Sequence, residues 1–409
     1  MVNCMTKDKD KKVPVLRFKG FTDDWEQRKL EEVVKIIGGG TPSTKISKYW
    51  NGNINWYSPT EISNKIFVNS SRKKITELGL KKSSAKLLPG GRTILFTSRA
   101  VIGDMAIMTT NGSTNQGFQS WVVNSKLANI YFLFSLGKEI KKQALRKASG
   151  STFLEISNSE VKKLILSVPN LEEQTNIGKL LRLLDNLITL QQRKLGLLKL
   201  LKKAMLQQLL TSSKFPVLRF KGFKRDWEQR KLKDIAIISD GIHQTPNYVN
   251  KGIMFLSVEN ILDLKSQKYI SNQDFQNNYK RKPLFHDIFM TRIGSVGVTN
   301  ILETDESIAF YVSLALIHPQ HVSAYYLNYL LKSPSSQKEI WKRTLHIAFP
   351  KKINKDEIGK INIKVSQNKQ EQIEIGNLLK KTERLISLQQ KRILRLQNFK
   401  QFLLQNMFI

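Results

Sequence analysis

The sequence has little cysteine, little histidine and few acidic side chains. A single cysteine, Cys4, among 409 residues excludes a disulfide framework and any zinc site that needs two thiolates. All five histidines lie in the second half, so no histidine site recurs in both halves. No apolar run reaches the roughly 18 residues of a membrane span, and the start lacks a hydrophobic signal core. We therefore expect a cytoplasmic chain with no membrane contact.

The positive charges are in large excess. Lys and Arg number 67 against 33 Asp and Glu, which gives a formal net charge of +34. Such an excess is typical of proteins that bind a polyanion, above all a nucleic acid. Apolar residues make up 40% of the chain, so we expect folded domains and not a disordered basic tail.

The chain repeats itself. The segment 14–30, PVLRFKGFTDDWEQRKL, returns at 216–232 with changes only at Thr22 and Asp23. A second repeat closes each half, since LITLQQRK at 187–194 returns as LISLQQKR at 385–392. The protein therefore consists of two related halves in tandem.

Each half closes with a long predicted helix. Asn170 and Asn368 occupy N-cap positions, and no proline follows either before the end of its segment. Apolar residues then recur at alternating steps of three and four, which predicts a heptad seam in which Gln191 and Gln389 are polar. We expect the two helices to pair antiparallel, because the connection after the first helix is short; the alternative is two amphipathic helices that each pack on their own domain. The predicted seam residues are Ile177, Leu181, Leu184, Ile188, Gln191, Leu195, Leu198, Ile375, Leu379, Ile386, Gln389, Ile393 and Leu396.

The remainder of each half has the pattern of an α+β domain. Short β-like runs bounded by Gly and Pro occur in both halves, among them 93–97 and 287–291, and helix-like stretches follow at 130–146 and 323–343. The fold class is therefore α+β, with two tandem domains, each followed by a long helix, and the two helices paired as an antiparallel coiled coil. The predicted parts are a basic tail at 1–13, a first domain at 14–165, a long helix at 166–211, a second domain at 212–365 and a long helix at 366–409.

The sequence offers little for catalysis. It has no phosphate-binding loop ending in Gly-Lys-Ser/Thr, no Asn-Pro-Pro-aromatic methyltransferase signature and no acidic cluster that recurs with a lysine. His318 and His321 are separated by Pro319, which breaks a helical metal pair, so we expect no metal site. A non-catalytic binding protein is the better hypothesis.

Side chains suited to DNA occur in loop-like stretches of both halves. Basic residues that suit phosphate contacts are Arg72, Lys73, Lys74, Arg92, Lys280 and Arg281. Side chains that suit base edges are Thr41, Ser43, Thr44, Lys45, Ser98, Arg99, Asn115, Gln116, His243, Gln244, Thr291, Arg292 and Ser295. The alternative for each is an ordinary solvated charge or loop residue.

These features together resemble the specificity subunits of Type I restriction–modification systems. The resemblance rests on the two Leu-Arg-Phe … Trp-Glu openings, Gly39-Gly40-Thr41-Pro42-Ser43, Phe96-Thr97-Ser98-Arg99 with Ile102-Gly103, Met290-Thr291-Arg292 with Gly294, and the two Glu-Gln-x-x-Ile-Gly helix starts. It implies two target recognition domains that each read one half of a split double-stranded DNA site. The stretch 240–246 does not keep Gly-Gly-Thr-Pro, so we expect the two domains to have different targets.

The resemblance also implies partners. The long helices would dock two methyltransferase (modification) subunits, and restriction/translocase subunits would join them. This chain would bind no cofactor, because S-adenosylmethionine, ATP and Mg would sit on the partners. Two alternatives stay open: a free-standing DNA-binding regulator or architectural protein, and a divergent nuclease or RNA-processing enzyme.

Overall fold

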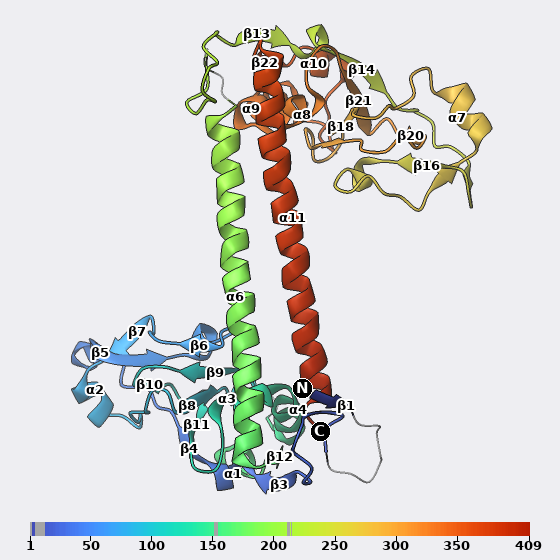
Figure 1. The fold of residues 1–409 in the computed structure, drawn as a ribbon. Coiled ribbons are helices and arrows are strands. Elements are labelled where there is room, and N and C mark those ends of the chain that lie inside the picture. Colours follow the sequence, from blue (N-terminus) through green and yellow to red (C-terminus); the bar gives the residue numbers. More distant parts are fainter. Residues whose placement is uncertain (1, 5–12, 151–153, 211–212, 214) are drawn as a thin grey trace. The chain divides into compact units, whose positions relative to one another are not determined.

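The computed structural model describes residues 2–4, 13–150, 154–210, 213 and 215–409. The chain divides into two compact units. The first unit is Met1–Gln191 with Arg392–Ile409, and the second unit is Gln192–Lys391. Figure 1 labels their elements. Most of the predicted basic tail, 1–13, lies outside the described residues, apart from the short strand β1 (Val2–Cys4), which pairs with β2 (Leu16–Phe18).

The first unit contains a five-stranded sheet in the order β4-β11-β8-β9-β6. All neighbours pair antiparallel except β6 and β9, which are parallel. A smaller sheet has the order β10-β5-β7, and β3 pairs with β12. The strands are β3 (Glu26–Lys29), β4 (Val34–Gly38), β5 (Trp50–Tyr57), β6 (Phe67–Val68), β7 (Lys73–Ile75), β8 (Thr93–Phe96), β9 (Met105–Met108), β10 (Gly112–Thr114), β11 (Gln119–Val123) and β12 (Ile165–Val168).

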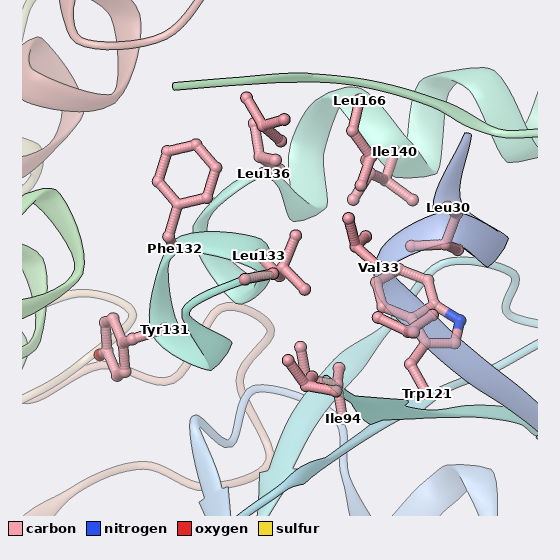
Figure 2. Close-up of a cluster of buried hydrophobic side chains, with 14 of the residues drawn as sticks. Leu30, Val33, Ile94, Trp121, Tyr131, Phe132, Leu133, Leu136, Ile140 and Leu166 are labelled. Carbon is pink, nitrogen blue, oxygen red and sulfur yellow. The ribbon is translucent and has the colours of Figure 1, made fainter. Parts of the chain in front are cut away.

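Short helices cover one face of the larger sheet and form the core with it. They are α1 (Leu30–Val33), α3 (Ile130–Ser135), α4 (Gly137–Lys147) and α5 (Asn158–Lys162), while α2 (Glu77–Lys81) belongs to the smaller sheet. Figure 2 shows Leu133 of α3 and Val33 of α1 directed toward Trp121 of β11. Asn129 begins α3, because its side-chain oxygen accepts from the Tyr131 and Phe132 N–H groups.

The second unit repeats this plan with a shorter sheet. Its main sheet is β14-β21-β18-β19, its second sheet is β15-β17-β16-β20, and β13 pairs with β22. The strands are β13 (Glu228–Lys231), β14 (Ala236–Asp240), β15 (Tyr248–Val249), β16 (Ile253–Leu256), β17 (Tyr269–Ile270), β18 (Ile288–Thr291), β19 (Thr299–Ile301), β20 (Ile308–Phe310), β21 (Leu314–Pro319) and β22 (Asn362–Val365). The helices are α7 (Asn272–Asn278), α8 (Ala324–Lys332), α9 (Pro334–Arg343) and α10 (Lys355–Gly359).

The two long helices are α6 (Leu171–Gln208) and α11 (Lys369–Asn406). Both predicted N-caps are present, since Asn170 Oδ1 accepts from the Glu173 N–H at 2.9 Å and Asn368 Oδ1 accepts from the Glu371 N–H at 3.2 Å. The helices begin later than the boundaries 166 and 366, because residues 165–168 and 362–365 are strands. Pro169 separates the first of these strands from its helix.

The predicted seam residues face protein in each unit. In the first unit, Leu403 and Met407 of α11 share a core with Ile177 and Leu181 of α6. In the second unit, Met205 and Leu206 of α6 pack on the core that holds Ile375 and Leu379. Each long helix therefore packs both on its own domain and on a part of the other helix. Among the seam positions, those buried are Ile177, Leu181, Leu184, Ile188, Ile375, Leu379, Gln389 and Ile393, and those half-buried are Gln191, Leu195, Leu198, Ile386 and Leu396.

Candidate nucleic-acid interface

Three loops of the first unit meet at the end of its larger sheet. We call residues 39–45, 97–103 and 115–117 the first loop cluster. The Gly40 N–H donates to Thr114 O at 2.8 Å, and a Cβ on Gly39 would lie 1.8 Å from Asn115 O. Only glycine permits this approach. The Thr41 hydroxyl consequently reaches Gln116, to which it donates a hydrogen bond, so the structure brings these two predicted residues together.

Two tryptophans hold the first of these loops. The indole N–H of Trp56 donates to Gly40 O at 2.9 Å, and that of Trp50 donates to Ser43 O at 3.1 Å. Their rings meet edge to face at 5.1 Å, and Lys73 Nζ lies 5.7 Å from the Trp50 ring. Neither tryptophan is among the site residues predicted from the sequence. Their even spacing along a β-like run was the available signal, because it places both on one face of a strand.

The second loop of the cluster contains one buried and one exposed predicted residue. The Ser98 side chain is buried, while its N–H donates to Gly117 O at 2.8 Å and so joins this loop to the third. Arg99 is exposed and forms an ion pair with Glu155 at 2.9 Å. In this structure Arg99, and not Ser98, offers its side chain to a ligand.

The remaining predicted residues of the first unit lie at different places. Ser43, Thr44 and Lys45 are exposed on the first loop. Asn115 is half-buried, and its side chain accepts from the Gly117 N–H. Arg92 precedes β8, whereas Ser98 and Arg99 follow it, so Arg92 lies at the opposite end of that strand. It lines a hollow with Asn129 and Leu171, apart from the cluster. Arg72 and Lys74 are on or beside β7, exposed and half-buried respectively.

The second unit has an equivalent arrangement with other side chains. We call residues 240–244, 291–297 and 311–313 the second loop cluster. Asp240, at the end of β14, forms an ion pair with Arg292. The carbonyl of Phe310 accepts from the Ile242 N–H at 3.2 Å and from the Tyr279 hydroxyl at 2.8 Å. This double acceptance brings the segments that carry His243 and Lys280 to the same strand end.

Burial again divides the predicted residues of the second unit. Thr291 is fully buried, and its hydroxyl donates to Ser295 O, which closes the loop. Arg281 is half-buried, and the predicted residues that are exposed are His243, Gln244, Lys280 and Ser295. Thr291, like Ser98, therefore shapes its loop in this structure. The Arg292 side chain is only 11% exposed in its ion pair with Asp240, while Ser295 offers its side chain to solvent.

Each unit fixes its domain to its long helix through the same residues, which we call the mounting contacts. Arg17 and Arg219, from the repeated openings, form bidentate ion pairs with Glu173 and Glu371 at 2.6–3.0 Å. The side chains of Gln174 and Gln372 accept from the N–H groups of Asn129 and Ser323. The Glu-Gln-x-x-Ile-Gly motif is thus a docking motif within the chain.

The glycine of that motif permits close approach. A Cβ on Gly178 would lie 2.5 Å from Asn129 Oδ1, and one on Gly376 would lie 2.9 Å from the Tyr326 nitrogen. Both distances are too short for any real Cβ contact, so the domain could not sit as close to a larger residue.

A tyrosine, an acid and a lysine form a chain of contacts in each unit. In the first, the Tyr131 hydroxyl donates to Asp185 at 2.6 Å, and Lys400 binds the same carboxylate at 2.6 Å. In the second, Tyr329 donates to Glu383 at 2.6 Å, and Lys202 binds that carboxylate at 2.6 Å.

The ion pairs of these triads join α6 to α11 within each unit. Burial raises the pKa of Tyr131, and its hydrogen bond to Asp185 adds to this, so the hydroxyl stays protonated as a donor. Each of the two lysines binds an acid on the other long helix.

Neither a metal cluster nor a membrane-spanning helix occurs among the described residues. Outside the gaps in the chain, no three His, Cys, Asp or Glu side chains gather where a metal ion could bind. Within the same residues, no helix is both long and apolar enough to cross a membrane.

A duplicated α+β chain with two long helices and two divergent loop clusters defines a class of two-domain binding proteins. Residues 22–200 match the family described as Type I restriction modification DNA specificity domain. The chain is 29% identical over 276 residues to the MjaIX specificity subunit of Methanocaldococcus jannaschii. The aligned region covers 63% of each protein. It is 28% identical over 180 residues to the EcoR124I/EcoR124II specificity subunit of Escherichia coli, which covers 42% of this chain and 43% of that protein.

A solved structure shows the same fold. The Type-I restriction-modification system S subunit from M. genitalium matches with a TM-score of 0.65 and 14% identity, covering 97% of this chain and 99% of that one. The resemblance to Type I specificity subunits is thereby confirmed, as is the α+β fold class. The matched region spans about 63% and 43% of the length of the first two curated relatives.

Proposed function

We propose that the chain is the DNA-recognition subunit of a Type I restriction–modification complex. One domain reads each half of a bipartite double-stranded target, and the chain has no catalytic activity of its own. The observation that carries the proposal is the contrast within the repeat: both domains are mounted by the same residues, while their loop clusters differ. A duplicated scaffold that carries different loops in each domain suits two domains that recognise different DNA sequences. The net charge of +34 suits phosphate contacts at both.

Exposed leucines on the long helices support protein partners. In the first unit, Leu183 and Leu190 of α6 are more than half exposed, and in the second unit Leu197 and Leu200 are as well. Exposed apolar patches of this kind mark protein interfaces. We assign them to two methyltransferase subunits, which restriction/translocase subunits then join. S-adenosylmethionine, ATP and Mg bind to these partner subunits, and the assembly acts on DNA in the cytoplasm.

A domain exchange tests the bipartite model. β12 pairs with β3, so the first domain is exchanged as residues 14–168, which ends before Pro169 and keeps this strand pair together. Methylated adenines are then mapped in cells that contain the partners, with and without the variant. We expect one half of the target to change and the other to stay the same. If both halves or neither changed, the two-reader model would be wrong.

The paired helices are proposed as the ruler between the half-sites. Inserting one heptad after Gln192 and a second after Arg392 keeps the heptad pattern and lengthens each helix by about 10 Å. At ~3.4 Å per base pair, the gap between half-sites should widen by about three pairs, with both half-site sequences unchanged. Leu195→Pro should instead break the helix and abolish specific binding. If the gap were unchanged in the insertion variant, the length of the helices would not determine the distance between the half-sites.

The alternative is a free-standing DNA-binding regulator. It predicts full specific binding by this chain alone and no gain on adding the modification subunits. We expect the reverse, because the exposed leucines of α6 are covered only in the complex.

A further inference from the structure

The second unit carries two large apolar side chains that are fully exposed. Ile347 is 99% exposed and Phe349 is 103% exposed, in the loop of residues 345–352 that follows α9. We call this segment the projecting loop. Phe and Ile are among the residue types most often buried, so a pair of them on one loop tip, with only Ala348 between, points to a ligand.

The base of the projecting loop is fixed to the second loop cluster. Its two ends join through the Leu345 N–H, which donates to Lys352 O at 2.7 Å. The Gly294 N–H donates to Lys351 O at 2.8 Å, and the Ile353 N–H donates to Arg292 O at 2.9 Å. These bonds fix the base of the projecting loop beside Ser295, whose side chain is exposed.

Cations and a tilted aromatic pair lie at the base of the loop. The Trp341 and His346 rings lie 4.0 Å apart, and Lys351 Nζ lies 4.7 Å from the Trp341 ring. Lys342 and Lys352 are exposed beside them. An apolar tip above a cationic base matches duplex DNA, in which the apolar base stack lies between two rows of phosphates.

We propose that Phe349, backed by Ile347, is a wedge that enters the base stack of the half-site bound by the second unit. Inserted Phe and Ile side chains unstack a base step and kink the duplex. The wedge should favour a pyrimidine–purine step, because such steps unstack most easily, and would add to sequence preference without any hydrogen bond to a base. This inference rests on the proposed function, and it adds a specificity-determining residue to it.

The test uses the full chain assembled with its modification subunits and a duplex that carries the mapped target. 2-Aminopurine replaces a base at successive positions of each half-site, and its fluorescence rises where stacking is lost. We expect a rise at one step in the half-site of the second unit. Phe349→Ala should abolish it and weaken binding roughly five- to a hundredfold, the usual range for loss of one aromatic–base contact. Phe349→Trp should keep both the rise and the affinity.

A matched control separates the outcomes. Val217 is 82% exposed in the same unit, but it lies beside the end of α6, where the Leu218 N–H donates to Gln208 O. Val217→Ala should change neither signal. Phe349 is fully exposed, so its variants should unfold at the unchanged temperature.

Equal affinity and fluorescence in wild type and Phe349→Ala would overturn the wedge. So would a loss confined to assembly with the modification subunits, which would make the loop a protein contact. Failure of the wild-type complex to prefer the mapped target would instead count against the proposed function itself.

Discussion

The two units share their mounting contacts and differ in their loop clusters. Arg17 with Glu173 and Arg219 with Glu371 are equivalent pairs, and the Tyr–acid–Lys triads also recur. Asp240 and Arg292 form an ion pair in the second loop cluster, whereas Gly38 and Ser98 stand at the corresponding ends of strands in the first. Contacts that hold a domain to its helix have been kept, and side chains within the loop clusters have diverged.

The largest effect is expected at a buried mounting contact. Arg17 and Glu173 are only 2% and 0% exposed, so Glu173→Ala leaves a buried guanidinium without its carboxylate. Breaking such a pair costs about 3–5 kcal/mol in the free energy of unfolding, measured by denaturant titration. Glu371→Ala should cost as much or more, because Glu371 also accepts from Trp227 and Ser366.

The matched control for this pair is Glu26→Ala. Glu26 forms an ion pair with Arg28 on the surface, where its side chain is 67% exposed. The loss should stay below about 0.5 kcal/mol. Equal losses for Glu173→Ala and Glu26→Ala would show that the repeated Arg–Glu pair does not mount the domain.

An intermediate effect is expected at the docking glycine. Gly178→Ala forces a methyl group against the Asn129 side chain that caps α3, and overpacking of this kind costs about 1–3 kcal/mol. Gly196 lies in the same helix, and a methyl group added there would meet no atom within 4 Å, so Gly196→Ala should raise stability by up to ~1 kcal/mol. Thermal unfolding of the two variants should therefore shift in opposite directions, and a shift in the same direction would contradict the docking role.

An effect of similar size is expected at the buried triad, and a smaller one at the exposed triad. Lys400→Met removes the cation from Asp185, which is 7% exposed, and should cost about 1–3 kcal/mol. Lys202→Met removes it from Glu383, which is 42% exposed, and should cost less than about 1 kcal/mol. Equal losses would mean that burial of the acid does not set the strength of these pairs.

The Lys202 pair should also depend on pH. Burial raises the pKa of Glu383, but Lys332, Lys202 and the Tyr329 hydroxyl outweigh it and hold that pKa below its ordinary value of 4.5. The pair therefore stabilises the folded state above pH 4.5, and this contribution is lost as the pH falls through the lowered pKa. The difference in stability between wild type and Lys202→Met should shrink toward zero in that acid range. A constant difference down to the acid limit would exclude Glu383 as the partner.

Features with a local or periodic cause could be predicted from the sequence. The repeats established two related halves, and both N-cap asparagines lie where the pattern put them, since capping involves only the next few residues. The strands within 93–97 and 287–291 follow from their short apolar runs, and the long helices follow from their apolar period. Each of the predicted helical stretches, 130–146 and 323–343, is divided into two helices. The stretch 323–343 is interrupted before Pro334, because the residue before a proline disfavours the helical conformation.

The candidate site depended on contacts between residues far apart in the chain. Amide and hydroxyl side chains in loops have no period, so the sequence ranked Ser98 and Arg99 alike, whereas the fold buries one and exposes the other. The tertiary structure likewise decided three other features. Trp50 and Trp56 bind the first loop, Arg92 lies apart from the cluster, and the projecting loop is fixed beside Arg292. Repeats and apolar periods can be recognised in consecutive residues. The exposure of a side chain depends on which distant parts of the chain pack against it.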